Sequence, residues 1–318
     1  MKAIITDLDM VSVQNEEKVF SEAGIPFERK QLHTEEALIE GCQDSEILLV
    51  QYAKITEKVM KALPKLKYIV RYGVGVDSID LEVATKLGIQ VGNVPDYGMN
   101  EVADHAIAMA LGLLRKVPIL NHQVKNIKWD YSVCIPVRRF STLTVGVVGL
   151  GRIGRNLAKK MDALGFQVIG YDPYYQANTE TDGYVTAVSF EELLERSDVI
   201  SLHCPADGNE KLFNKETFAK MKSSAILINV ARGAVVDDGD LDEALRTGQI
   251  AAAGLDTVSI EPAPSDYPLF KNENVIITPH MAWYSEEAGA ELQRKVAEEA
   301  VRFAKGEAIH YPVNKPNK

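Results

Sequence analysis

Short apolar runs alternate with longer stretches of helical periodicity along this 318-residue chain. In the first part of the chain the runs predict strands at 2–6, 47–50, 68–70 and 90–93. In the second part they predict strands at 144–148, 166–171, 225–228 and 275–278. Strands that alternate with helices favour parallel sheets covered by helices. Because the chain is longer than one typical core requires, we expect two α/β domains, each with a doubly wound parallel sheet.

A helix is predicted at 99–116, between the two series of strands, with Pro118 just beyond its end. Its apolar stripe consists of Val102, Ala106, Met109, Leu113 and Val117. We expect this stripe to bridge the two domains or to pack in a subunit interface. The polar stretch 121–141 that follows contains Trp129 and is too long for an ordinary connection. A last helix is expected to begin at Ser285, a residue typical of an N-cap.

The predicted strand 144–148 leads into Gly149-Leu150-Gly151-Arg152-Ile153-Gly154, which opens a helix. In such a unit the first glycine makes a tight turn, the second lets a pyrophosphate approach the backbone, and the third allows close helix packing. The helix N-terminus adds partial positive charge. Asp172 ends the next predicted strand, near the spacing of about 20 residues at which an acid accepts hydrogen bonds from ribose hydroxyls. A purely structural glycine turn does not explain Asp172, so we interpret the unit as a dinucleotide site.

Asp172 also bears on which dinucleotide binds. A carboxylate at this position repels a 2′-phosphate, and the residues after it, Pro173, Tyr174 and Tyr175, offer no basic partner for one. The sequence therefore favours NAD over NADP as the cofactor.

In the second half of the chain, Arg232 follows the predicted strand 225–228, Glu261 follows a further predicted strand at Gly254-Leu255-Asp256-Thr257, and His280 follows the strand 275–278. Ligands of open parallel sheets bind beyond the carboxyl ends of the strands, so we expect the three side chains to meet there. An arginine forks onto a substrate carboxylate, a histidine transfers a proton at a keto oxygen, and a glutamate holds the histidine and stabilises its charge. The group fits a site for a 2-oxo acid. From spacing alone, three unrelated loop residues are an equal alternative.

Composition narrows the classes of partner. The chain has 35 basic and 45 acidic residues, a net charge of −10, which argues against nonspecific binding to nucleic acid or to an anionic membrane. No long apolar run is present, and the N-terminus does not have the pattern of a signal peptide. Cys42, Cys134 and Cys204 lie far apart without metal-ligand spacing. We expect reduced thiols, a cytoplasmic protein and no metal site.

With these motifs in place, the chain resembles the D-isomer-specific 2-hydroxyacid dehydrogenases over nearly its whole length. The segments that carry the resemblance stand in the family's order: 70–77, 149–154, 202–205, 229–233, 254–256, Glu261-Pro262 and 278–280. The residues after His280, which include Trp283, resemble the C-terminal-binding-protein-like subgroup of this family more than the general pattern.

The resemblance implies two Rossmann/flavodoxin-like domains, the first discontinuous because the last helix returns to it. Residues 1–98 and 286–318 would form the substrate domain, and residues 99–285 the NAD-binding domain. The resemblance also implies a homodimer in which the segment after the helix at 99–116 packs on the partner subunit; a mobile surface loop is the alternative. The implied reaction interconverts a D-2-hydroxy acid and a 2-oxo acid by hydride transfer.

The resemblance assigns residues to each part of the site. Its catalytic residues fall on Arg232, Glu261 and His280, and its nicotinamide-contacting acid falls on Asp256. The expected cofactor-binding residues are Gly149, Gly151, Arg152, Ile153, Gly154, Asp172, Cys204, Pro205, Val230, Ala231, Arg232, Asp256 and His280. Cys204 is expected to form a wall of the cofactor pocket rather than a nucleophile, because no base lies near it in the sequence.

Substrate contacts are expected from both halves of the chain. Arg71 follows a strand, and the amides of Gly73, Val74 and Gly75 after it are able to bind a carboxylate. The resemblance places a substrate-contacting arginine at Arg71; a surface arginine beside a tight turn is the alternative. Tyr52 is a further candidate in the first domain. Trp283 is expected to line the substrate pocket, as in the subgroup; packing away from the substrate is its alternative.

Two other functions compete with this interpretation. The subgroup resemblance allows an NAD-binding dimeric scaffold that recruits peptides, as a corepressor does. A formate or phosphite dehydrogenase on the same fold is the enzymatic alternative, although it would need a pocket without the bulky Trp283.

Overall fold

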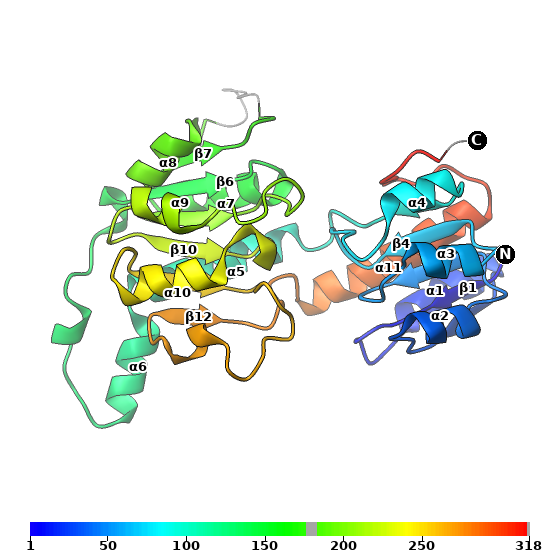
Figure 1. Ribbon diagram of the computed structural model, residues 1–318, viewed down its shortest axis with the longest axis horizontal. Helices are drawn as coiled ribbons and strands as arrows, with labels where there is room; N and C mark the ends of the chain where they lie inside the picture. Colours follow the sequence, from blue (N-terminus) through cyan, green and yellow to red (C-terminus); the bar gives the residue numbers. More distant parts are fainter. Residues whose placement is uncertain (176–182, 317–318) are drawn as a thin grey trace. The chain divides into compact units, whose positions relative to one another are not determined.

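The computed structural model describes residues 1–175 and 183–316 and divides into two units (Figure 1). Unit 1 comprises Met1–Gly98 and Ser285–Lys318, and unit 2 comprises Met99–Tyr284. Each unit has its own parallel sheet, of five strands in unit 1 and seven in unit 2, within the part of the chain described. The predicted fold class, two parallel-sheet α/β domains with the first discontinuous, is confirmed.

The sheet of unit 1 has the strand order β2-β1-β3-β4-β5. Its strands are β1 (Ala3–Ile5), β2 (Phe27–Arg29), β3 (Ile47–Val50), β4 (Tyr68–Arg71) and β5 (Gln90–Gly92). Its helices are α1 (Gln14–Ala23), α2 (Glu35–Gly41), α3 (Glu57–Ala62), α4 (Leu81–Lys86) and α11 (Glu286–Ala304). The short strand β2 was not predicted, because Phe27–Arg29 lacks an apolar run.

Alternate residues of the unit 1 strands pack on opposite faces of the sheet. Ile4, Leu48 and Ile69 belong to a core formed with α2, α3 and α4. On the other face α11 packs against α1, β3 and β4. As predicted, α11 begins after Ser285, whose hydroxyl accepts from Ala288 N at 2.9 Å.

The sheet of unit 2 has the strand order β12-β11-β10-β9-β6-β7-β8. Its strands are β6 (Thr144–Val148), β7 (Gln167–Tyr171), β8 (Thr186–Ala187), β9 (Val199–Leu202), β10 (Ile226–Asn229), β11 (Ala252–Leu255) and β12 (Val275–Ile277). Its helices are α5 (Met99–Leu114), α6 (Val117–Lys125), α7 (Arg152–Ala163), α8 (Phe190–Arg196), α9 (Lys215–Lys220) and α10 (Asp238–Arg246), with short 3-10 turns that include η3 (Gly233–Val235). The chain order reverses between β6 and β9, and ligands of such sheets bind at this switch point.

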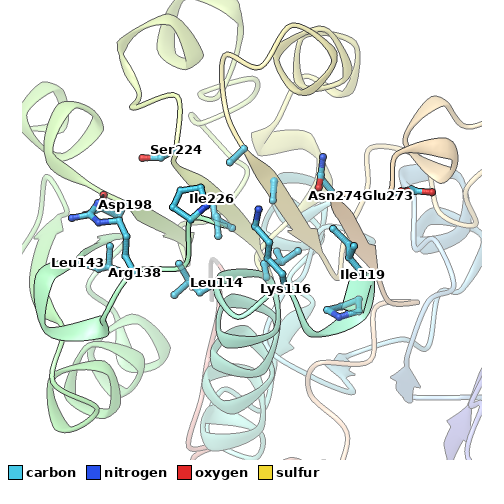
Figure 2. Close-up of a pocket in the computed structure, with 15 residues that line it drawn as sticks. Leu114, Lys116, Ile119, Arg138, Leu143, Asp198, Ser224, Ile226, Glu273 and Asn274 are labelled. Atoms are coloured by element: carbon cyan, nitrogen blue, oxygen red, sulfur yellow. Dashed lines mark hydrogen bonds and ion pairs between the residues drawn. The ribbon is translucent and has the colours of Figure 1, made fainter. Parts of the chain in front are cut away.

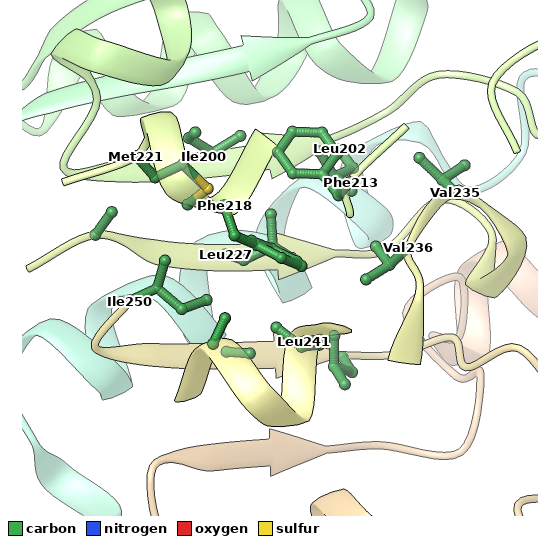
Figure 3. Packing of buried hydrophobic residues seen from close by; sticks show 14 of the residues in the cluster. Ile200, Leu202, Phe213, Phe218, Met221, Leu227, Val235, Val236, Leu241 and Ile250 are labelled. Atoms are coloured by element: carbon green, nitrogen blue, oxygen red, sulfur yellow. The ribbon is translucent and has the colours of Figure 1, made fainter. Parts of the chain in front are cut away.

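Two apolar cores cover the faces of the unit 2 sheet. On one face, side chains such as Leu202, Phe213 and Leu227 pack with α8, α9 and α10 (Figure 3). On the other face, residues such as Val145 and Ile228 pack with α5 and α7. Because both faces are buried, nearly all residues of β6, β9, β10 and β11 are shielded from solvent. This burial makes the sheet a rigid base for the loops at its carboxyl edge.

The stripe on α5 serves the core of unit 2. Ala106, Met109 and Leu113 are buried there, and α5 packs against α7, β10 and β11. The expectation that this stripe bridges the domains or forms a subunit interface was therefore wrong. An apolar helix stripe shows that a helix is covered, but it does not identify the surface that covers it.

The segment after α5 is more ordered than the sequence indicated. The chain turns at Lys116, which has a φ of 52°, and Pro118 lies in the first turn of α6 instead of merely following α5. Beyond α6, Ile127 is 95% exposed and Trp129 is 90% exposed. Large apolar side chains are seldom so exposed on one segment unless another surface covers them.

Candidate active site

The three glycines after β6 have three different structural roles. Gly149 has a φ of 93°, and a β-carbon there would lie 2.7 Å from the carbonyl carbon of His203. A β-carbon on Gly154 would lie 1.9 Å from the carbonyl oxygen of Gly149, so only glycine lets α7 approach the turn this closely. A β-carbon on Gly151, the N-cap of α7, would meet no atom within 4 Å. The open space above Gly151, at a helix N-terminus, fits a pyrophosphate.

Asp172 lies directly after β7 and is held beside the glycine loop. Its Oδ2 accepts a hydrogen bond from Leu150 N at 2.9 Å, and its Oδ1 accepts one from Tyr174 N at 2.8 Å. Each carboxylate oxygen has further lone pairs, so both are able to accept from ribose hydroxyls. The fixed negative charge at this place disfavours a 2′-phosphate. The glycine loop and Asp172 therefore fit NAD.

Arg232 is positioned by a compact turn after β10. The side chain of Asn229 accepts from Ala231 N at 3.0 Å and donates to the carbonyl oxygen of Arg232 at 2.9 Å. The guanidinium donates to the carbonyl oxygen of Ala231 at 2.7 Å. A β-carbon on Gly233 would lie 1.9 Å from the carbonyl carbon of Val258, so this glycine allows the turn to pack on the loop that leads to Glu261.

Glu261 and His280 form a direct pair. Oε2 of Glu261 lies 2.7 Å from Nδ1 of His280, and Oε1 accepts from Val258 N at 3.1 Å. Burial raises the pKa of Glu261, but the hydrogen bond and charge of His280, the Val258 amide and the charge of Arg232 together lower it below its usual value. The carboxylate is therefore charged, and the positive charge of Arg232 acts on it in the same direction as that of His280.

The ring of His280 is oriented for chemistry at its other nitrogen. Because Glu261 accepts at Nδ1, that nitrogen carries a proton and Nε2 is left for a substrate. The side chains of His280 and Glu261 are 35% and 36% exposed, so the pair is open to a ligand. A histidine held in this way by a carboxylate is suited to general acid–base catalysis.

Asp256 anchors the turn that carries His280. Its side chain is almost fully buried and accepts from Met281 N at 3.0 Å, from Ala282 N at 2.9 Å and from the Thr278 hydroxyl at 2.5 Å. Its carbonyl oxygen accepts from His280 N at 2.8 Å. This anchoring role of Asp256 was not predicted from the sequence, and its expected contact with nicotinamide stays a prediction.

The remaining cofactor candidates follow the ends of neighbouring strands. Val230 and Ala231 are mostly buried after β10, and Cys204 and Pro205 follow β9, with Cys204 half-buried and Pro205 exposed. Burial raises the pKa of the Cys204 thiol to about 11, so the thiol stays protonated at neutral pH. A protonated thiol is a poor nucleophile, which agrees with a role as a pocket wall. Arg152 and Ile153 begin α7 beside the open space at Gly151.

The predicted substrate residues of unit 1 lie beyond the ends of β3 and β4. Arg71 ends β4, and Gly73 has a φ of 125°; a β-carbon there would lie 1.8 Å from Nη1 of Arg71 and 3.4 Å from the hydroxyl of Tyr97. Gly73 therefore makes room for the guanidinium. Tyr52 is 51% exposed, yet burial, followed by the charge and hydrogen bond of Asp9, raises its pKa to about 12, and Arg71 partly offsets this effect.

The structure thus groups Tyr52 and Arg71 with Asp9 and Tyr97, two residues that the sequence analysis did not select. Their contacts could not be predicted from the sequence, because they belong to loops that only the sheet brings together. Val74, beside this group, is 41% exposed, and Gly75 follows it. Trp283 lies in unit 2, three residues after His280, and its ring contacts Tyr284 edge to face at 5.5 Å between centroids. Substrate contacts by these residues stay predictions.

A cavity of about 290 Å³ lies at the amino end of the unit 2 sheet, away from the carboxyl edge that carries Arg232, Glu261 and His280. Figure 2 shows the residues that line it. Asp198, Ile226 and Asn274 line it just before or at the start of β9, β10 and β12, and Arg138 pairs there with Asp198 at 2.9 Å. Ligands of open parallel sheets bind at the carboxyl ends, not the amino ends, of the strands. This cavity is therefore separate from the candidate active site.

The structure gives no metal site within residues 1–175 and 183–316, where no three His, Cys, Asp or Glu side chains form a group able to hold an ion. Over the same residues, every helix is too short or too polar to cross a bilayer.

The glycine loop, Asp172 and the Arg–Glu–His group at one sheet edge define the cofactor unit of a nicotinamide-dependent oxidoreductase. Residues 107–282 match the family model described as "D-isomer specific 2-hydroxyacid dehydrogenase, NAD binding domain". The chain belongs to this family, as the sequence motifs predicted, and its predicted cofactor, NAD, is confirmed. The finer resemblance to the C-terminal-binding-protein-like subgroup stays a prediction.

Relatives of known name support this membership. The chain is 38% identical over 296 residues to a D-3-phosphoglycerate dehydrogenase of Archaeoglobus fulgidus, covering 92% of this chain and 56% of that protein. The chain thus spans little more than half the length of the curated relatives it matches.

Solved structures match along their whole length. A D-lactate dehydrogenase from Aquifex aeolicus, complexed with NAD and lactic acid, has a TM-score of 0.91 at 30% identity, covering 99% of this chain and 100% of that one. A D-2-hydroxyisocaproate dehydrogenase has a TM-score of 0.86 at 27% identity with the same coverage.

Proposed function

We propose that this protein is an NAD-dependent dehydrogenase that interconverts a D-2-hydroxy acid and a 2-oxo acid. The observation that carries the proposal is the Glu261–His280 contact of 2.7 Å, formed beside Arg232 at the same sheet edge as the glycine loop. A charged anchor, an acid–base residue and a dinucleotide site are the three elements that this reaction requires.

The residues divide the reaction among them. In the direction of reduction, Arg232 binds the substrate carboxylate with its planar fork of donors and fixes the keto carbon in place. NADH, which the glycine loop and Asp172 would hold, would supply the hydride for that carbon. His280, whose Nδ1 is held by Glu261, donates a proton from Nε2 to the oxygen as negative charge develops there. In the direction of oxidation, neutral His280 accepts the hydroxyl proton, and Glu261 stabilises the resulting imidazolium.

Steady-state NADH oxidation with a panel of 2-oxo acids tests this function. We expect turnover with at least one 2-oxo acid, and kcat/KM at least about tenfold higher with NADH than with NADPH, because Asp172 is held beside the ribose site. As a comparison, the oxidation of formate and of phosphite is measured with NAD⁺ as the acceptor. Turnover of formate or phosphite but of no 2-oxo acid would contradict the proposal and support a formate or phosphite dehydrogenase. Binding of NADH without turnover of any of these compounds would contradict it and support an NAD-binding scaffold.

The substrate class is proposed from Trp283. A large aromatic side chain three residues after His280 supplies an apolar wall, against which each buried methylene contributes roughly 0.8 kcal/mol. We therefore infer that longer apolar or thioether 2-oxo acids are better substrates than glyoxylate. The measurement is kcat/KM for glyoxylate and for a six-carbon 2-oxo acid in the wild type and in Trp283→Ala. The ratio of kcat/KM for the six-carbon acid to kcat/KM for glyoxylate should be smaller in the variant than in the wild type. An unchanged ratio would mean that Trp283 packs in the protein without contacting the substrate.

We also propose a homodimer that uses the segment after α6. Ile127, Trp129 and Tyr131 are exposed by 95%, 90% and 74%, respectively, which fits a surface that a second copy covers. Light scattering on the purified protein should give twice the chain mass, and Trp129→Ser with Ile127→Ser should lower it toward the monomer. A monomeric wild type would contradict this assembly. The three free cysteines fit a reducing compartment such as the cytoplasm, where we place the protein.

A further inference from the structure

His105 on α5 takes part in a hydrogen-bond network that ends at the catalytic turn. Its Nε2 lies 2.9 Å from the hydroxyl of Thr278, and that hydroxyl lies 2.5 Å from Oδ1 of Asp256. Nε2 itself is 3.7 Å from the same carboxylate oxygen. The side chain of His105 is 20% exposed and that of Asp256 is 1% exposed, so the network is largely shielded from water. All three residues belong to unit 2.

The direction of each hydrogen bond follows from counting protons. A threonine hydroxyl has one proton, and beside a buried carboxylate it donates that proton to Asp256. The Thr278 oxygen then acts toward His105 only as an acceptor. His105 must therefore donate from Nε2, which excludes the neutral tautomer protonated only at Nδ1.

The network bears on His280 through the turn between them. His280 has a φ of 52°, a conformation that is uncommon for a residue with a β-carbon and that persists only where its surroundings impose it. The constraint comes from Asp256, whose carbonyl oxygen and carboxylate bind the amides of His280, Met281 and Ala282. His105 fixes the Thr278 hydroxyl at the start of the same turn.

We propose that His105 is a positioning residue of the active site: by donating from Nε2 to Thr278, it holds the Asp256-bound turn that aims His280 at the substrate. This role rests on the proposed function, in which His280 transfers the proton. His105 is not part of the Glu261–His280 pair and acts through Thr278 and Asp256. Misplacing a catalytic group by about 1 Å is able to reduce turnover by about 10²-fold, so an indirect contact is enough to affect the rate.

The first test is a pair of substitutions at His105. His105→Leu removes the donor and keeps an apolar side chain, whereas His105→Gln retains an N–H donor at a similar distance from the backbone. We expect kcat for 2-oxo acid reduction to fall at least about tenfold in His105→Leu, with little change in KM for NADH. We expect His105→Gln to restore most of the lost turnover. Equal kcat in all three proteins, or equal loss in both variants, would overturn the proposal.

The second test does not depend on activity. In ¹⁵N-histidine-labelled wild type, long-range ¹H–¹⁵N spectra should show His105 protonated at Nε2, and a neutral ring protonated only at Nδ1 would overturn the network. The ring resonances of His280 should change in His105→Leu and remain close to wild type in His105→Gln; unchanged resonances in His105→Leu would also overturn the proposal. A wild type without turnover of any 2-oxo acid would refute the proposed function, while these spectra would still decide whether His105 positions His280.

Discussion

Unit 1 and unit 2 each place a glycine turn directly after a strand of a parallel sheet, but the two turns serve different purposes. After β6, Gly149 turns the chain with a φ of 93°, and α7 starts at once with Gly151 as its N-cap. After β4, Gly73 turns the chain with a φ of 125°, and no helix begins until α4 at Leu81–Lys86. The first turn presents a helix N-terminus, and the second makes room for the guanidinium of Arg71.

The third glycine explains the difference. Gly154 packs so closely on the carbonyl of Gly149 that a β-carbon would lie 1.9 Å from its oxygen, and this contact brings the helix to the turn. The equivalent position in unit 1 is Ser78, which has a β-carbon. Two glycines thus permit a turn, but close helix packing is needed to make the turn an anion site. The structural basis of the cofactor site therefore lies in unit 2, and the substrate contact of Arg71 in unit 1 stays a prediction.

The largest expected effect is the loss of turnover in His280→Ala. Removing the general acid should lower kcat by about 10²–10⁴-fold, as is usual for proton transfer by a side chain. The matched control is His310→Ala in unit 1, because His310 also contacts a glutamate, Glu299, at 2.8 Å. We expect the control to retain its turnover. Near-normal kcat in His280→Ala, or an equal loss of kcat in both variants, would contradict the assignment of proton transfer to His280 in unit 2.

The next effect is expected at Arg71 in unit 1. A hydrogen bond to a charged group contributes about 1.5–3 kcal/mol, so Arg71→Ala should raise KM for the 2-oxo acid by roughly 10–100-fold, with a smaller effect on kcat. Arg71→Lys keeps the charge without the planar fork and should be intermediate. The measurement is KM for the acid at saturating NADH. An unchanged KM for the acid in Arg71→Ala would mean that Arg71 has only a structural role in the turn and does not contact the substrate.

A smaller effect is expected for Gly151→Ala. The added β-carbon meets no protein atom within 4 Å, so the free energy of unfolding should hardly change, but the methyl group would occupy the space assigned to the pyrophosphate. We expect KM for NADH to rise about tenfold, equivalent to about 1.4 kcal/mol.

The control for this variant is Gly112→Ala on α5, where the β-carbon would lie 3.7 Å from Ile276. That variant should keep the KM for NADH and gain helix stability, because alanine is the better helix former. Unchanged NADH binding in Gly151→Ala would argue against a pyrophosphate at this turn.

The smallest effect is a shift in the pH dependence of Glu261→Gln. Burial raises the pKa of Glu261, but His280 and its other partners lower it overall. A carboxyl with a lowered pKa in the folded state stabilises the fold above its usual pKa, and this stabilisation is lost as the pH falls through the lowered value. The variant should therefore be less stable than the wild type at neutral pH, with the difference shrinking in acid.

The pH dependence of the activity should also change in Glu261→Gln. The substitution removes the negative charge of Glu261, which stabilises the imidazolium form of His280, so the variant should lose 2-oxo acid reduction at a lower pH than the wild type does. Profiles of kcat and of thermal unfolding against pH test both statements. Glu299→Gln in unit 1 is the control, and a shift of the activity profile in that variant as well would contradict the local explanation.

Much of the site was predictable because its residues follow strands. Asp172, Arg232 and His280 were found from apolar runs that end in polar residues, since parallel strands bring all their carboxyl ends to one edge. The contacts of Asp9, Tyr97 and His105 were not predicted, because the sequence pattern does not show which distant residues a loop or helix side chain will meet.

The sequence by itself determined the two parallel sheets, the glycine loop and the family, because these depend on local periodicity and on residues close together in the chain. It did not determine the surface that covers the stripe of α5, which only packing assigned to the core of unit 2. Only the tertiary structure showed that Asp256 ties down the turn of His280 and that Glu261 and His280 meet at 2.7 Å. Contacts of this kind join residues distant in sequence, and their geometry exists only after the sheet has aligned the ends of its strands.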